Sequence, residues 1–155
     1  MISSKKLKRI STAIYGLMRA NVLNDSISHN ASAGLGQTHE LLKYYIYIEI
    51  CNTEPVIDYV YNTDCAIAIG RQVDGNTICI QDPAVSRKHA CVYEQGGSLW
   101  IENVSGENVI DIRSGLFHTT VYAGEVVSVA SDDVIKLGDE KFRMYLLQGP
   151  ETVVN

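Results

Sequence analysis

The sequence predicts an all-β protein, an antiparallel β-sandwich of about eleven short strands that follows an N-terminal extension with a helical and a flexible part. Three observations support this fold class. Short runs rich in β-branched and aromatic residues recur from Tyr44 onward. Turn signals such as Asp74-Gly75-Asn76 and Gly96-Gly97 separate the runs, and no long helical period interrupts them. Such a pattern is typical of two packed sheets.

The first strand is predicted over residues 44–50, where the hydrophobic period becomes two. Aromatic and β-branched residues fill it, as strands prefer. The other strands are predicted by the same signals at residues 56–61, 65–69, 77–80, 89–94, 99–104, 109–112, 119–122, 126–129, 134–137 and 142–147.

The pattern changes near residue 40, which predicts three segments. Residues 1–40 form the N-terminal extension: apolar residues at intervals of three and four predict a short basic amphipathic helix over 5–20, and residues 24–39 are rich in Asn, Ser, Gly and Ala, like a flexible linker. Residues 41–148 form the sandwich domain. Residues 149–155 form a C-terminal tail.

Charge and composition narrow the class of partner. The net charge is −5, yet residues 1–20 carry five basic residues and no acid, so the remainder is strongly acidic. A folded part of that charge is a poor nucleic-acid binder. No apolar run is long enough for a transmembrane segment. The four cysteines form no C-x-x-C pair, which predicts reduced thiols in a cytoplasmic protein with no metal and no cofactor.

Two predicted loops carry the chemistry. Gly70-Arg71 follows the strand at 65–69, and Ser86-Arg87-Lys88-His89 precedes the strand that continues at Ala90. Guanidinium groups, an ammonium and a hydroxyl together suit an oxyanion with several acceptor oxygens, such as a phosphate. Ser86 and His89 do not indicate a hydrolase, since the sequence has no G-x-S-x-G elbow and no evident third residue. We therefore expect a binding protein and no enzyme.

The ordered motifs resemble the forkhead-associated (FHA) domain family. The residues that carry the resemblance are Gly70-Arg71, Ser86-Arg87-Lys88-His89-Ala90, and Val134-Ile135-Lys136-Leu137-Gly138 with Phe142. The resemblance covers about residues 44–148 and implies a sandwich that binds phosphothreonine peptides through arginine-rich loops. It implies an adaptor in Ser/Thr-kinase-linked signalling or secretion, whose partner is a phosphothreonine-containing protein such as a kinase or its substrate.

The resemblance also implies a role for each motif residue. Arg71 would contact the phosphate or the adjoining peptide backbone, and Ser86 would donate its hydroxyl to the phosphate. Arg87 would reach the peptide or phosphate, and Lys88 would add charge nearby. Gly70 would permit a tight exit from its strand, and His89 would be a buried ring that holds the loop through hydrogen bonds.

A third loop, residues 105–109, departs from the family pattern. The family has a Ser-Thr-Asn-Gly segment there, whose Asn holds the peptide backbone. Aligned without a gap, Glu107 replaces that Asn; aligned with a shift of one residue, Asn108 is the family Asn and Val109 replaces the glycine. The departure keeps an alternative open: a structural or assembly module with the FHA fold, a degenerate site and no dependence on phosphate.

Overall fold

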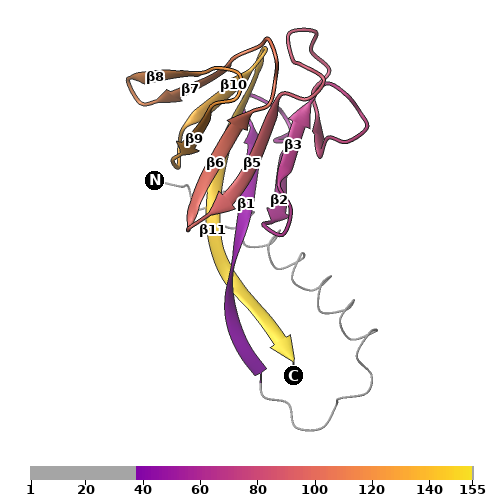
Figure 1. Cartoon of the computed structure of the whole chain (residues 1–155). Coiled ribbons are helices and arrows are strands. Elements are labelled where there is room, and N and C mark those ends of the chain that lie inside the picture. The colour runs from indigo at the N-terminus through magenta and orange to yellow at the C-terminus, as the bar shows by residue number, and fades with distance from the viewer. Residues whose placement is uncertain (1–37, 155) are drawn as a thin grey trace.

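The computed structural model describes residues 38–154, which form eleven strands and no helix (Figure 1). Every predicted strand is present, which confirms the all-β sandwich. No helix in this part of the chain is long and apolar enough to cross a membrane. The predicted N-terminal helix and most of the predicted linker lie outside the described residues. The strands are β1 (Thr38–Ile50), β2 (Asp58–Asn62), β3 (Ile67–Gly70), β4 (Ile78–Cys79), β5 (Ala90–Gln95), β6 (Ser98–Asn103), β7 (Ile110–Ser114), β8 (Phe117–Val121), β9 (Val126–Val129), β10 (Val134–Leu137) and β11 (Glu140–Val154).

The strands form two sheets. One has six strands in the order β2-β1-β11-β10-β7-β8, and the other has five in the order β4-β3-β5-β6-β9. One pair departs from the antiparallel pattern: β3 and β4 run parallel, with Ile69 opposite Ile78. Residues 71–77 carry the chain back along β3, so that β4 continues in the same direction and buries the Ile78 side chain beside it.

The core lies between the sheets and follows from the period of two. In β5 and β6, residues whose side chains point inward alternate with half-exposed ones. Ile101, Ile135 and Phe142 are fully buried. A second apolar cluster on the other side of β1 packs Tyr47 against Tyr145, with ring centroids 5.9 Å apart. Residues 45–48 of β1 are therefore buried on both faces, which explains their unusually apolar sequence.

Strand β1 pairs with β11 along its whole length, from Ile50 opposite Phe142 to Thr38 opposite Val154. This pair crosses both predicted domain limits, at residues 41 and 148, and β1 begins inside the segment predicted as a linker. Composition could not reveal this, because antiparallel pairing uses backbone groups that every residue other than proline carries. The pair extends from the sandwich as a long ribbon, away from the loops between β3 and β5 (Figure 1).

Candidate functional site

Three loops meet at the end of the sandwich that lies away from the ribbon. They are residues 71–77 after β3, residues 80–89 before β5 and residues 104–109 after β6, and we call them the site loops. The backbone N–H of Arg71 donates to the Ser86 carbonyl (2.9 Å), and the N–H of Val104 donates to the His89 carbonyl (3.0 Å). The two motifs found in the sequence are therefore adjacent in space.

Arg71 is fixed at its guanidinium as well as at its backbone. Its Nε–H donates to the carbonyl of Val85 at 3.0 Å, next to Ser86. The side chain is otherwise exposed, and its terminal nitrogens have no hydrogen-bond or ion-pair partner in residues 38–154. A guanidinium held by one edge keeps its other donors for a ligand, and its planar fork suits an oxyanion.

Gly70 allows the first two site loops to approach each other closely. A Cβ built on Gly70 would overlap the carbonyl oxygen of Arg87 and would lie 2.9 Å from the Arg87 carbonyl carbon. Both are backbone atoms, which cannot rotate away as a flexible side chain can. The absence of a side chain at Gly70 therefore lets the end of β3 lie close to the backbone of the 80–89 loop.

Ser86 is the centre of a small hydroxyl network. Its Oγ lies 2.6 Å from the Ser105 Oγ and accepts a hydrogen bond from Asn108 Nδ2 at 2.7 Å. The Ser105 Oγ also accepts the backbone N–H groups of Glu107 (3.2 Å) and Asn108 (2.9 Å). A hydroxyl oxygen has two lone pairs and one proton. Both lone pairs of Ser105 are occupied, so Ser105 must donate its proton to Ser86.

This assignment decides what Ser86 can do. Its own oxygen then accepts two hydrogen bonds, one from Ser105 and one from Asn108. The hydroxyl proton of Ser86 therefore has no acceptor among the described residues. A half-buried O–H with both lone pairs satisfied is oriented by its neighbours and is free to donate to an anion.

Asn103, the last residue of β6, holds the third site loop in place by hydrogen bonds. This fully buried amide donates from Nδ2 to the carbonyls of Asn108 and Val121, both at 2.8 Å, and its Oδ1 accepts the N–H of Ser105 at 2.9 Å. Sequence reasoning missed Asn103. The available signal was that a polar residue occupies an inward position in the alternation of β6.

The structure distinguishes the two alignments of the third loop. The Asn108 side chain reaches Ser86, whereas Glu107 is exposed and bonds to the network only through its backbone N–H. Asn108, and not Glu107, therefore contributes its side chain to the hydroxyl network. None of residues 104–109 has a positive φ, so the loop takes a path that requires no glycine at Val109.

His89 joins the 80–89 loop to the 104–109 loop from inside the protein. The ring is fully buried; Nδ1 accepts the N–H of Ser86 at 3.2 Å, and Nε2 lies 2.9 Å from the Val109 carbonyl. Because Nδ1 is an acceptor, Nε2 carries the proton and donates to Val109. Burial lowers the pKa of His89 below its ordinary value of 6.5, and the bond to Val109 opposes that shift in part.

This pKa shift predicts a loss of stability in weak acid. The unfolded chain binds a proton at His89 near pH 6.5, and the folded protein binds it only at lower pH. The stabilisation is therefore complete above 6.5 and is lost as the pH falls through 6.5 toward the folded pKa. Urea unfolding at several pH values checks this. His89→Gln should abolish that part of the pH dependence, and an unchanged pH profile in the variant would contradict the assignment.

Arg87 and Lys88 lie on the exposed surface of the 80–89 loop. The Arg87 carbonyl accepts the N–H of Gln72 (3.1 Å) and Nδ2 of Asn76 (2.7 Å), so the loop is held while the cationic side chain stays in solvent. Asn76 also donates to the Gln72 carbonyl at 2.7 Å. Sequence reasoning placed Asn76 only in a turn, whereas it links two site loops.

The nearby carboxylate of Asp82 is directed elsewhere. It accepts the backbone N–H groups of Asp139 (2.8 Å) and Ala84 (2.9 Å), and these bonds lower the pKa of Asp82. Asp82 thereby ties the 80–89 loop to the turn between β10 and β11. Within residues 38–154, no group of three or more histidine, cysteine or carboxylate side chains is placed to hold a metal ion.

Comparison with solved structures identifies similar folds. The FHA domain of the CT664 protein from Chlamydia trachomatis aligns with a TM-score of 0.53 at 15% identity, covering 64% of this chain and 95% of the other. An FHA domain from Arabidopsis thaliana aligns with a TM-score of 0.58 at 24% identity, covering 78% and 98%. EmbR of Mycobacterium tuberculosis, in complex with a low-affinity phosphopeptide, aligns with a TM-score of 0.53 at 23% identity, covering 64% and 24%.

A search of curated protein sequences found no match. The family model of the FHA domain matches residues 67–138, from the first residue of β3 to the glycine after β10. That range includes all three site loops and every residue expected at the site. Residues 67–138 match the FHA domain model and the structural neighbours share the sandwich, so this part of the chain is similar to FHA domains in sequence pattern and in fold.

Proposed function

We propose that this protein is an adaptor that binds phosphothreonine peptides through the site loops. The observation that carries the proposal is the Ser86 hydroxyl, whose proton is left for a ligand by the network with Ser105 and Asn108. The guanidinium of Arg71 is anchored on the carbonyl of Val85, the residue before Ser86. The EmbR complex, which contains a phosphopeptide, adds support from a similar fold.

The donors suffice for a specific complex. A phosphate carries about −1.5 to −2 charges and three acceptor oxygens. Each charge-assisted hydrogen bond contributes about 1.5–3 kcal/mol, so Arg71, Ser86 and Asn108 together approach the roughly 8 kcal/mol of a micromolar complex. Arg87 and Lys88, exposed on the same loop, raise the local positive potential and speed encounter with the anion.

The test is the affinity of Arg71→Ala for a phosphothreonine peptide selected from a library, measured by calorimetry. We expect binding to weaken by about 10- to 150-fold, because one or two charge-assisted bonds are lost. Arg113→Ala is the matched control, since it removes the same charge from an exposed arginine in β7. Equal affinities for the two variants would refute the role of Arg71.

The unphosphorylated twin of the peptide tests the alternative. If it binds as tightly as the phosphopeptide, the domain is a phosphate-independent assembly module. The exposed Glu107 carboxylate on the third loop is the feature that favours this alternative, because it would repel a phosphate nearby. We further propose a cytoplasmic site of action, in kinase-linked signalling or secretion. The four free cysteines, two of them exposed, fit a reducing compartment.

A further inference from the structure

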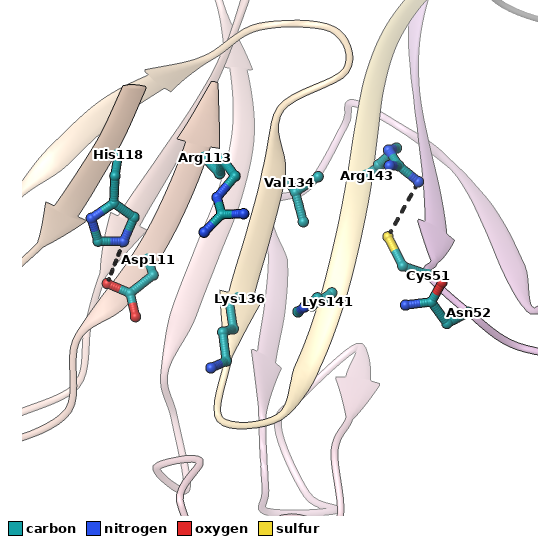
Figure 2. A pocket seen from close by; sticks show the side chains of 9 residues that line it. All are labelled: Cys51, Asn52, Asp111, Arg113, His118, Val134, Lys136, Lys141 and Arg143. Carbon is teal, nitrogen blue, oxygen red and sulfur yellow. Dashed lines mark hydrogen bonds and ion pairs between the residues drawn. The ribbon is translucent and has the colours of Figure 1, made fainter. Parts of the chain in front are cut away.

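A second cationic feature lies away from the site loops, on the outer face of the six-stranded sheet. A cavity of about 460 Å³ opens there over β7, β10 and β11, and Figure 2 shows the side chains around it. Four of them are basic: Arg113, Lys136, Lys141 and Arg143. We call this cavity the basic groove.

The positive charge of the groove contrasts with the acidic composition of the described residues. Residues 38–154 contain eight Lys and Arg and seventeen Asp and Glu. Half of those eight basic residues line this one groove. None of the four forms an ion pair with a carboxylate of the described residues, and Arg143 contacts only the thiol of Cys51, at 3.6 Å. Because these cationic side chains form no ion pair with the many carboxylates of the described residues, they are available to bind an external anion.

The strand register fixes the arrangement. Val134 stands opposite Arg113 on one side and opposite Arg143 on the other, and Lys136 stands opposite Lys141. Side chains two residues apart on a strand share a face, so all four cations project from the same side of the sheet. Two lysines directly opposite each other repel and destabilise the sheet, and a bound anion would relieve that repulsion.

The one acid in the groove is already engaged. The Asp111 carboxylate lies 3.4 Å from Nε2 of His118 and accepts a hydrogen bond from the Thr120 hydroxyl at 3.3 Å. Figure 2 shows Asp111 and His118 together at one edge, with the cations spread across the rest of the groove. The open part of the surface is therefore positive.

We propose that the basic groove binds an acidic polypeptide segment of a partner protein, independently of phosphothreonine. Arg113 and Arg143 are two strands apart, about 10 Å, which matches carboxylates about three residues apart in a short extended peptide. A nucleic acid is disfavoured: a duplex carries one charge per roughly 1.7 Å, which the rest of this acidic domain would repel. No Phe, Tyr or Trp side chain lines the groove for a base to stack on, and the one aromatic ring there, that of His118, lies at its edge beside Asp111.

The experiment measures binding of a fluorescein-labelled hexaglutamate peptide to the full chain by fluorescence anisotropy. The double variant Lys136→Gln/Lys141→Gln removes two groove charges. The control Arg87→Gln/Lys88→Gln removes the same two charges from the site loops. We expect the groove variant to weaken hexaglutamate binding by about 4- to 25-fold, because each of the two exposed ion pairs contributes a factor of roughly two to five. The control should leave hexaglutamate binding within about two-fold.

A parallel titration separates this proposal from the proposed function. Phosphothreonine peptide affinity should be unchanged in the groove variant and weakened in the control. Amide shifts caused by hexaglutamate should appear in β7, β10 and β11. No hexaglutamate binding, equal losses in both variants, shifts confined to the site loops, or tighter binding of a short DNA duplex than of hexaglutamate would each overturn the proposal.

Discussion

Gly70→Ala is expected to lower the free energy of unfolding by about 3 kcal/mol and to remove phosphopeptide binding. The added Cβ would overlap the Arg87 carbonyl oxygen and crowd Nδ2 of Asn76, at 3.0 Å. Overpacking of this kind costs roughly 1–3 kcal/mol, and more where backbone must move. The 80–89 loop would have to retreat, and it carries Ser86. Urea unfolding and calorimetry with the phosphothreonine peptide measure the two effects.

Gly106→Ala is the matched control for that experiment. Gly106 lies in the third site loop, has no atom within 4 Å of a built Cβ, and does not require a positive φ. Alanine there should leave the free energy of unfolding unchanged or raise it slightly, because it restricts the unfolded chain. If Gly70→Ala proves as mild as Gly106→Ala, the close approach of the two site loops is not essential.

His89→Ala should lower the free energy of unfolding by about 3 kcal/mol. The substitution opens a cavity at a fully buried position and leaves two backbone groups, the Ser86 N–H and the Val109 carbonyl, without their partners. Cavity formation and unsatisfied polar groups each contribute to the cost. Thermal or urea unfolding of the variant at pH 7.5 gives the value.

His118→Ala provides the comparison, since His118 is exposed and contacts only Asp111. Its effect should stay within about 0.5 kcal/mol. His89 contributes no donor to the ligand, so His89→Ala should keep measurable phosphopeptide affinity at temperatures where it stays folded. Two outcomes would contradict the structural role of the His89 ring. One is a His89→Ala protein as stable as the parent. The other is a folded His89→Ala protein that loses phosphopeptide binding as completely as Arg71→Ala does.

The sequence predicted the strands because a buried sheet face imposes a period of two that is visible residue by residue. The parallel β3–β4 pair escaped prediction because direction depends on how the 71–77 loop turns, and β4 has only two residues. The full length of β1 and β11 escaped as well, because their outer parts are paired through backbone groups rather than marked by a core pattern.

The site was predictable in part for a similar reason. Arg71, Ser86 and His89 occur in an ordered motif, and the structure brings them together. Asn76, Asn103 and Ser105 carry no such signal, because each acts by hydrogen bonds across loops that are distant along the chain. The third loop shows the same limit: only the contact between Asn108 and Ser86 decides which residue faces the site.

The β1–β11 ribbon makes this domain suitable for insertion into another protein. Thr38 is paired with Val154, so the chain enters and leaves the domain side by side. A unit whose ends are neighbours can be spliced into a surface loop of a host without forcing the ends of that loop apart. The ribbon would then act as a stalk that holds the site loops away from the host (Figure 1). A binding module of this form is portable between hosts.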